Sequence, residues 1–289
     1  METPEDLHIW SNTDFPYMCL KDEPRTNAFK NAISIVVKKG DVVIDIGSGS
    51  GILALFAANA GAQKVYAVEI DHVLADALRQ TVKANGLEKT IEVIESDATT
   101  AELPKNADVV LGEIIETGLI DEMQVPVMNL LRERGVIGPD TTVLPEKYQS
   151  YLECVYTNHE YYGFKILAPK HEWPFYENPK EGWYHSEFEP VSEKKLILEA
   201  DFNQIIDPKV STQIVFERIK DTAKPITAIR LSGIITLCEG VELGPTNALN
   251  GDKIFPIDPA MQGSEHVKVE ISYEMGSGYR AFNFLASSI

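Results

Sequence analysis

Three glycines at alternate positions, Gly47, Gly49 and Gly51, stand between an apolar run and a stretch rich in leucine and alanine, with Ser48 between the first two. Glycine accepts positive φ and has no Cβ, so a turn of this kind lets a ligand come within contact distance of the backbone. Glu69 follows about 20 positions later, where an acidic side chain can accept hydrogen bonds from ribose hydroxyls. The spacing predicts a site for a cofactor that contains a nucleoside.

The residues around these glycines predict the elements that position them. The β-branched run at 42–46 suits a strand buried on both faces of a parallel sheet. Residues 52–60 are good helix formers, and 64–68 form a second strand that leads into Glu69. The amide groups at the start of that helix would point into the same space as the glycine turn. An ordinary tight connection between strand and helix is the alternative interpretation.

The glycine pattern separates two kinds of cofactor. A dinucleotide site has glycine at the first, third and sixth places of its turn, and Ile52 occupies the sixth place here. The pattern D-x-G-x-G-x-G from Asp45 to Gly51 resembles instead motif I of the S-adenosylmethionine-dependent methyltransferases. The resemblance implies S-adenosylmethionine as the cofactor. It also implies that these residues contact the cofactor: Asp45, Gly47, Ser48, Gly49, Gly51, Glu69 and Ile70.

Composition disfavours several classes of protein. The 289 residues include 26 basic and 44 acidic ones, a net charge of −18, and a surface this negative repels phosphates, so no nucleic-acid partner is expected. Acidity that only keeps the protein in solution is the alternative. No apolar run approaches the roughly 20 residues that span a bilayer, and the N-terminus lacks a signal-peptide pattern, so no membrane partner is expected. Cys19, Cys154 and Cys238 are scattered, which predicts reduced thiols in a cytoplasmic protein and no metal site.

The segment before the first strand carries a second group of charged residues. Asp22 or Glu23 can cap a helix that has proline in its first turn and continues through 27–37. Together with motif I, the stretch L-K-D-E-P-R-T at 20–26 resembles the protein arginine N-methyltransferase family. The resemblance implies that Arg25 holds the carboxylate of the methionine part of the cofactor, through two parallel hydrogen bonds. A surface ion pair is the alternative for this arginine.

Further candidates follow the third predicted strand. Residues 70–86 predict a helix and 91–94 a strand, after which come Asp97 and Ala98. Ligands of open α/β sheets lie outside the carboxyl ends of the strands, so these two residues are predicted to contact the adenine. Asp97 could instead only turn the chain. The resembled family has a glutamate two positions after this aspartate, where Thr99 stands here.

The loop after the fourth predicted strand, at 107–111, is the predicted centre of the chemistry. The resembled family carries two glutamates in this loop, and Glu113 and Glu122 stand at its spacing. The family's tryptophan, methionine, glycine and tyrosine between them are replaced by Ile114, Ile115, Glu116 and Thr117. Without the resemblance, the acidic residues could be the solvated start of the helix that follows.

Two carboxylates suit a guanidinium, which is planar, always protonated and a poor nucleophile. They would align one nitrogen with the methyl carbon and draw positive charge toward the other nitrogens. We therefore expect Glu113 and Glu122 to be catalytic, with either able to accept the proton, and the resemblance places Glu113 among the cofactor-binding residues as well. The family also pairs the aspartate of its D-x-x-R-T motif with a histidine of a Thr-His-Trp motif. Residues 244–248, Gly-Pro-Thr-Asn-Ala, occupy that place here, so Asn247 is expected to hydrogen-bond Asp22, and the resemblance places both residues in the catalytic site.

The chain from Val136 onward predicts antiparallel strands, because short apolar runs alternate with polar residues and turn signals. These runs are 151–156, 195–201, 212–218, 226–237, 253–257, 267–273 and 279–285. The spacing predicts a sandwich or barrel, and the resembled family has a β-barrel. The predicted fold is therefore α/β followed by β. Its predicted parts are an N-terminal helical segment covering the cofactor at 1–40, a Rossmann-like S-adenosylmethionine-binding domain at 41–144 and a β-barrel substrate domain at 145–289.

The irregular aromatic stretch 168–190 resembles the dimerisation arm of that family, which implies a homodimer. A loop folded on to its own barrel is equally compatible with the sequence.

The function predicted from these observations is methylation of a guanidino group, either of arginine in a protein or of free arginine or another guanidino small molecule. The departures from the family fall on the substrate side. An aromatic pair expected near Asp6, Leu7 and Trp10 is absent, and Cys19 replaces a methionine. Two alternatives stay open. The chain could methylate another nucleophile, or it could be a catalytically silent cofactor-binding partner of another methyltransferase.

Overall fold

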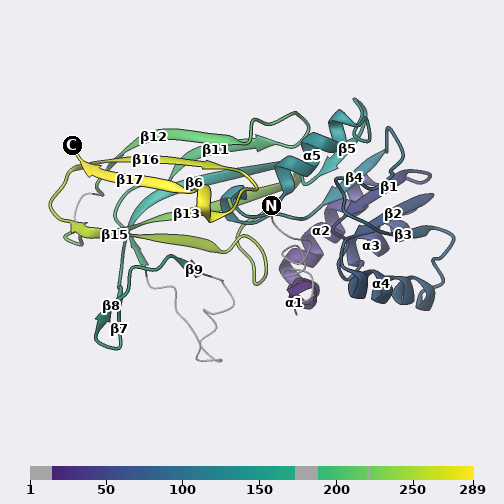
Figure 1. The fold of residues 1–289 in the computed structure, drawn as a ribbon, viewed down its shortest axis with the longest axis horizontal. Coiled ribbons are helices and arrows are strands. Elements are labelled where there is room, and N and C mark those ends of the chain that lie inside the picture. Colours follow the sequence, from purple (N-terminus) through teal and green to yellow (C-terminus); the bar gives the residue numbers. More distant parts are fainter. Residues whose placement is uncertain (1–14, 173–187, 220–221) are drawn as a thin grey trace.

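A parallel sheet with helices and a set of antiparallel strands lie end to end in the computed structural model of the chain (Figure 1). The structure describes residues 15–172, 188–219 and 222–289. Much of the predicted arm therefore lies outside the described residues, as do the three N-terminal residues that stand where the family has its aromatic pair.

The first part is a five-stranded parallel sheet with the order β3-β2-β1-β4-β5. Its strands are β1 (Val42–Ile46), β2 (Lys64–Glu69), β3 (Ile91–Glu95), β4 (Val109–Gly112) and β5 (Thr142–Leu144). The strand order reverses between β1 and β4, and their register sets Ile46 beside Gly112. Ligands of such sheets bind outside the carboxyl ends of the strands at the point of reversal. The glycine turn after β1 and the loop after β4 therefore leave the sheet side by side.

The α-helices of the described residues are α1 (Phe15–Lys21), α2 (Glu23–Val36), α3 (Ile52–Ala60), α4 (His72–Ala84) and α5 (Gln124–Glu133). The predicted cap of α2 is confirmed, because Asp22 Oδ1 accepts a hydrogen bond from the Arg25 backbone N–H at 3.2 Å. The helix predicted over 70–86 begins later, since Asp71 caps it by accepting from the Leu74 backbone N–H at 2.9 Å.

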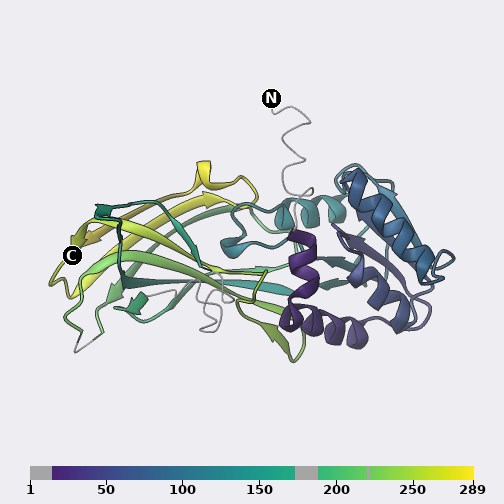
Figure 2. The same ribbon diagram turned by 90° about the horizontal axis from the view of Figure 1, so that it is seen from below.

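The separate helix α1 was not predicted. Figures 1 and 2 both show it at the junction between the parallel sheet and the antiparallel strands. Among the helices of the described residues, none combines the length and the apolar composition that crossing a membrane requires.

The second part consists mainly of two antiparallel sheets, which confirms the predicted β-rich C-terminal domain. The larger sheet is centred on β6 (Lys147–Thr157) and β13 (Ile226–Cys238), and the smaller one contains β12 (Lys209–Glu217), β16 (His266–Glu274) and β17 (Asn283–Ser288). The remaining strands are β7 (Glu160–Tyr161), β8 (Phe164–Lys165), β9 (Lys170–Glu172), β10 (Phe188–Pro190), β11 (Lys195–Asp201), β14 (Val241–Leu243) and β15 (Asp252–Met261).

The strand predicted over 279–285 is wrong in its first half. Tyr279–Ala281 form a short 3-10 helix, η4, and the strand begins at Asn283. The reason lies just before η4, where Gly276 and Gly278 have positive φ. Their backbone N–H groups donate to the carbonyls of Leu119 and Ile120 at 3.0 and 2.9 Å, which holds the chain in a turn against the first part of the molecule.

One hydrophobic core runs through both parts. β5 ends at Leu144 and β6 begins at Lys147, so the change from parallel to antiparallel pairing takes only two residues. Phe29 of α2 and Leu231 of β13 are fully buried members of the same apolar cluster. The two parts are therefore packed against each other rather than joined by a free linker.

Buried hydrogen bonds attach the loop after β4 to the antiparallel part. Within the loop, residues Thr117–Leu119 form a 3-10 helix, η2. The Gly118 N–H donates to the Tyr148 hydroxyl at 2.9 Å, and that hydroxyl donates to Asn250 Oδ1 at 2.7 Å. Asn250 Nδ2 in turn donates to the Gly233 carbonyl at 2.6 Å. The loop is therefore positioned by the β domain as well as by β4.

Gly233→Ala tests this attachment, because a methyl group at this position would overlap the Tyr148 hydroxyl and crowd Asn250 Oδ1. We expect the free energy of unfolding to fall by about 2–3 kcal/mol, as typically follows overpacking and loss of a buried hydrogen bond. Gly244→Ala is the matched control, since a methyl group there meets no atom within 4 Å. Urea unfolding of both variants measures the effect. Equal stabilities would show that the network does not hold the loop.

Candidate active site

The glycine turn is joined directly to the carboxylate at the end of β2. Glu69 is only 5% exposed, and its Oε2 accepts a hydrogen bond from the Gly49 N–H at 2.8 Å. Its other oxygen accepts from the Asp71 N–H at 2.9 Å. Gly49 makes its contact with φ at +51°, a conformation that favours glycine. The turn and the predicted ribose-binding acid thus form one unit.

Asp45 is a buried carboxylate whose two oxygens make no well-formed hydrogen bond within the described part of the chain, although the Ser48 side chain and the Ala54 backbone N–H favour its ionised form. The side chain is 1% exposed, and burial raises its pKa to about 7. Buried polar atoms are nearly always paired, so an unpaired one needs an explanation, such as a ligand that completes it. A cation or an N–H donor bound beside the glycine turn would do so.

Asp97 and Ala98 lie beside Glu69, since the Ser96 N–H donates to the Glu69 carbonyl at 3.0 Å. Asp97 Oδ1 accepts from both the N–H and the hydroxyl of Thr99 at 2.7 Å, so one carboxylate oxygen turns the chain. Both interpretations of Asp97 therefore have a structural basis. Arg134, which no motif in the sequence indicated, donates from its guanidinium to the Thr99 carbonyl at 2.8 Å and holds this segment in place.

Ile70 lies at the same edge of the sheet, directly after Glu69, and is 38% exposed. Its apolar side chain is therefore accessible to a ligand at this edge.

Arg25 and Glu113 form a buried ion pair between α2 and the loop after β4. The guanidinium also donates to the Cys19 carbonyl at 3.3 Å, but Arg25 Nε has no hydrogen-bond partner among the described residues. Burial lowers the pKa of Arg25, which is 5% exposed. The structure thus brings together the arginine predicted for the cofactor and a glutamate predicted for the substrate.

The predicted contact between Asn247 and Asp22 is wrong. Asn247 is exposed, and Asp22 Oδ2 accepts instead from the backbone N–H of Ala248 at 2.7 Å. The turn containing Thr246, whose N–H donates to the Leu249 carbonyl at 2.8 Å, directs this amide toward α2. A backbone group therefore supplies the hydrogen bond that the sequence led us to expect from a side chain.

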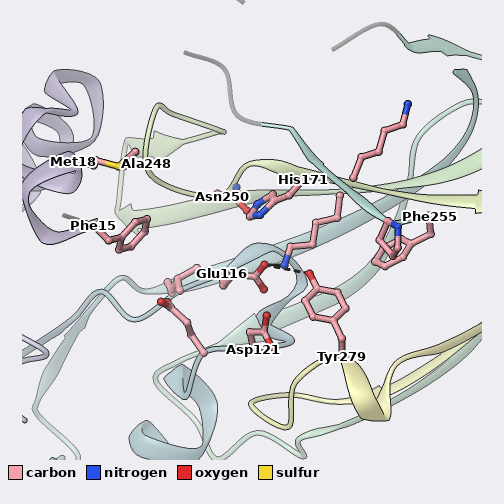
Figure 3. A pocket seen from close by; sticks show the side chains of 14 residues that line it. Phe15, Met18, Glu116, Asp121, His171, Ala248, Asn250, Phe255 and Tyr279 are labelled. Carbon is pink, nitrogen blue, oxygen red and sulfur yellow. Dashed lines mark hydrogen bonds and ion pairs between the residues drawn. The ribbon is translucent and has the colours of Figure 1, made fainter. Parts of the chain in front are cut away.

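A cavity of about 560 Å³ opens where the loop after β4 meets α1 and the antiparallel strands (Figure 3). Its walls come from α1, the loop after β4, β9, the 248–255 segment and η4. Glu122 lines the cavity, and burial raises its pKa to about 7 against the opposing effect of the Arg25 charge. Glu113 is not among the lining residues, because Arg25 occupies its carboxylate. The two predicted glutamates are thus both near Arg25, but only one of them faces the cavity.

A second buried ion pair, between Glu116 and Lys253, lines the cavity and was missed by sequence analysis. Lys253 is 3% exposed, and its Nζ lies 4.4 Å from the centroid of the Tyr279 ring. The Tyr279 hydroxyl donates to Glu116 Oε1 at 3.3 Å, as Figure 3 shows. One member of the ion pair could have been found from the sequence, because Glu116 replaces a glycine of the resembled family. Lys253 lies far along the chain and gave no comparable signal.

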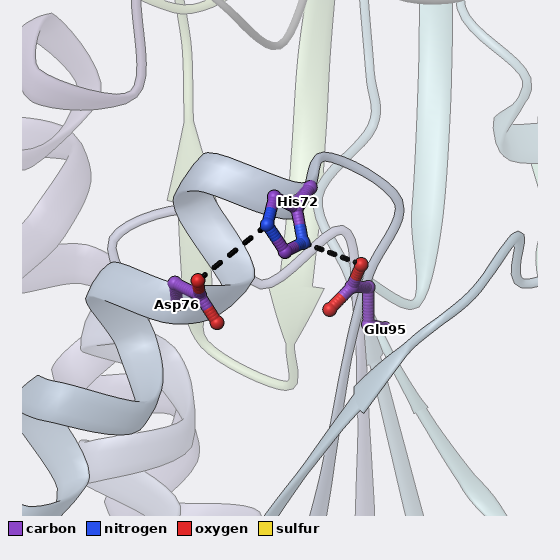
Figure 4. A group of neighbouring side chains, drawn as sticks. All are labelled: His72, Asp76 and Glu95. Carbon is purple, nitrogen blue, oxygen red and sulfur yellow. Dashed lines mark hydrogen bonds and ion pairs between the residues drawn. The ribbon is translucent and has the colours of Figure 1, made fainter.

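His72, Asp76 and Glu95 form an exposed cluster on α4 and β3 (Figure 4). His72 Nδ1 lies 2.7 Å from Glu95, and His72 Nε2 lies 3.6 Å from Asp76. Arg79 pairs with both carboxylates, at 2.6 and 3.0 Å. Because a permanent cation already contacts both acids, the geometry favours an exposed ion-pair network over a metal site.

The sequence matches the family model of ribosomal protein L11 methyltransferase (PrmA) over residues 23–175. It is 36% identical to the uncharacterized protein MJ1452 of Methanocaldococcus jannaschii, over 90% of this chain and 92% of that protein. It is also similar to protein arginine N-methyltransferase 6 of Danio rerio, at 38% identity over 46% of this chain, and to arginine N(omega)-methyltransferase of Streptomyces achromogenes subsp. streptozoticus, at 35% over 45%. The chain spans only 38% and 37% of the length of these two relatives.

The fold is similar to that of a solved structure, the Trypanosoma brucei PRMT1 enzyme-prozyme heterotetrameric complex with AdoHcy. The TM-score is 0.73 at 18% sequence identity, and the match covers 94% of this chain and 96% of that chain. Together these matches confirm the resemblance predicted from motif I and the 20–26 stretch, as well as the predicted fold class.

Asp45→Asn tests whether the buried carboxylate destabilises the free protein. A folded-state pKa near 7, raised from an ordinary value of about 4, means that stability is lost as pH rises from about 4 to about 7. We expect the variant to be more stable than wild type by on the order of 2 kcal/mol at about pH 8, with a smaller difference at about pH 5. Urea unfolding at both pH values measures this, with the exposed Asp140→Asn as the control. A difference that does not depend on pH would contradict the assignment.

Proposed function

This chain belongs to the methyltransferase family that the PrmA model describes and is a divergent relative of the protein arginine N-methyltransferases, and from that premise we propose that it methylates a guanidino nitrogen of an arginine-type substrate. Its cofactor is S-adenosylmethionine. The main support for the proposal is the position of Glu122. Its carboxylate lies on the cavity wall, and the positive charge of Arg25 favours its ionised form.

The unpaired polar atoms of the site fit this cofactor. Asp45 offers two buried carboxylate oxygens to its α-ammonium group, and Arg25 Nε is a free donor for its carboxylate. Glu69, already fixed by Gly49, accepts from the ribose hydroxyls. When bound, S-adenosylmethionine supplies an electrophilic methyl carbon on a positively charged sulfur.

Glu122 binds the substrate guanidinium by a charge-assisted hydrogen bond and orients one nitrogen toward the cofactor pocket. Held in this way, that nitrogen would face the electrophilic methyl group that the bound cofactor would supply. The methylated guanidinium then carries one excess proton, which the Glu122 carboxylate accepts. A pKa raised by burial suits this role, because the group is ready to take up a proton near neutral pH.

Glu113 joins this grip once Arg25 turns toward the carboxylate of the cofactor. In the free protein the two side chains neutralise each other in a buried position. If Arg25 held the carboxylate of the cofactor, Glu113 would be free to bind the substrate guanidinium as well. Cofactor binding would thereby precede formation of the substrate site.

Glu122→Gln keeps the shape of the side chain but removes its charge and basicity. We expect kcat to fall by on the order of 10²–10⁴-fold, while the affinity for S-adenosylmethionine stays within about threefold of wild type. Formation of S-adenosylhomocysteine with arginine substrates measures turnover, and calorimetry measures cofactor affinity. Glu133→Gln, at the exposed end of α5, is the matched control. Normal turnover by Glu122→Gln would exclude this role.

The pH dependence of kcat/KM reports on the same group. Only the ionised form of Glu122 can bind a guanidinium, and its pKa in the free protein is about 7. We therefore expect kcat/KM to decrease as pH falls through about 7, with a slope approaching tenfold per pH unit below it. Initial rates across pH measure the profile. A profile that stays flat down to about pH 5 would mean that no group with this pKa binds the substrate.

A further inference from the structure

The second ion pair of the cavity, between Glu116 and Lys253, has no role in the chemistry described so far. It lies on the same cavity as Glu122, in the part lined by Phe255 and Tyr279. The Lys253 ammonium pairs with the Glu116 carboxylate on the cavity wall. Figure 3 shows Asp121 and Tyr279 near Glu116. Besides the carboxylate assigned to the guanidinium, the cavity lining therefore contains two further carboxylates, Glu116 and Asp121, and two lysines, Lys170 and Lys253.

Lys253 is the cation that the lining residues present to a ligand. Lys170 also lines the cavity, but its ammonium donates to the Thr157 hydroxyl at 3.1 Å and to the Asn158 carbonyl at 2.6 Å. Burial lowers the pKa of His171 to about 4, so this ring is neutral at ordinary pH. An anionic group entering the cavity would therefore be directed to Lys253.

Fold stability alone is a poor explanation for this pair. Buried ion pairs often contribute less than apolar residues of the same size would, because both charges lose their hydration. Burial raises the pKa of Glu116 and lowers that of Lys253, so the surroundings favour the neutral form of each. Glu116 Oε2 is buried and makes no well-formed hydrogen bond within the described ranges, although the Asp121 backbone N–H, like Lys253, favours the ionised form of this carboxylate. The pair is incomplete, and a ligand carrying both charges would complete it.

We propose that the substrate is a free α-amino acid with a guanidino side chain, whose α-carboxylate binds Lys253 and whose α-ammonium group binds Glu116 and Asp121. This inference rests on the proposed function, because it takes Glu122 as the site of the guanidinium. The charged groups of the cavity match those of that molecule. Glu122 would bind the guanidinium, Lys253 the α-carboxylate, and Glu116 and Asp121 the α-ammonium group. An arginine within a peptide has neutral amides at the latter positions, which would leave Lys253 and Glu116 without charged partners.

The size and walls of the cavity also suit a small substrate. A volume of about 560 Å³ lies within the range typical of sites for small molecules. β9 pairs with β15 beside this ion pair, with His171 opposite Lys253 in the register. The added strand gives the cavity a wall of backbone and side chains on the Lys253 side.

Three guanidino compounds test the α-carboxylate and the α-ammonium group of the substrate separately, without any mutation of the protein. L-Arginine carries both α-groups, agmatine lacks the carboxylate, and Nα-acetyl-L-argininamide has neither charge. We expect kcat/KM to fall by on the order of 10²-fold from arginine to agmatine and further to the amide, because buried charges are left unpaired. Methyl transfer from labelled S-adenosylmethionine to each compound, and to an arginine-rich peptide, measures this. Equal or faster turnover of agmatine, the amide or the peptide would overturn the inference and leave the proposed function standing.

Lys253→Met tests the assigned cation directly. We expect kcat/KM for arginine to fall by on the order of 10²-fold while that for agmatine stays within about threefold, which a purely structural role of Lys253 would not produce. Lys195→Met is the control, because Lys195 is half-buried and donates to the Val215 carbonyl at 2.8 Å, outside the cavity lining. If Lys253→Met does not fold, Lys253→Gln, which removes the charge but keeps a polar side chain and leaves Glu116 in place, is measured instead with the same expected loss for arginine and not for agmatine.

The outcomes of this experiment distinguish the two proposals. A parallel loss with arginine and agmatine would overturn the role of Lys253 alone. Absence of methyl transfer to every guanidino compound, from wild-type protein that binds S-adenosylmethionine, would overturn the proposed function and this inference with it.

Discussion

The chain between Glu113 and Glu122 is fixed from two sides, and the candidate site depends on this constraint. Parallel pairing of β1 and β4 sets the start of the loop beside the glycine turn. Buried hydrogen bonds from Thr117 to the Gly251 carbonyl and from Gly118 to Tyr148 fix its middle to the antiparallel part. The carboxylates of the loop are therefore positioned by backbone that belongs to two sheets. They cannot move apart to relieve their repulsion without breaking these bonds.

Because the loop is held in place, ionising its buried carboxylates costs free energy. Asp45, Glu116 and Glu122 all have pKa values raised by burial, and the charges of Asp121 and Glu122 add to the shift of Glu116. In the free protein the nearby cations are therefore too few to keep these buried carboxylates ionised without cost. Strongly shifted pKa values of this kind cluster at functional sites, where a ligand supplies the missing charge. A positively charged sulfur and a guanidinium are both ligands that would lower this cost.

Local patterns in the sequence predicted the elements that carry the site, but not the contacts made across the molecule. The glycine turn, the Asp22 cap and the alternation in β16 are properties of neighbouring residues, so composition and period reveal them. The partner of Asp22 is a backbone amide, and because every residue except proline has one, no residue type predicts it. The Glu116 partner lies in β15 and shares no repeat or motif with the loop. Such pairings are decided by tertiary packing of two domains and need the structure.

The amide at Ala248 also changes which groups can respond to pH. The resembled family has a histidine at this place, whereas a backbone N–H holds Asp22 without titrating. Glu122 and Lys253 then remain as cavity groups with pKa values near 7, and they lose their charges in opposite directions. A zwitterionic substrate with a guanidinium needs both groups charged, and its own charges favour that state. Binding and ionisation are therefore coupled, so the substrate itself widens the pH range in which the cavity is complementary to it.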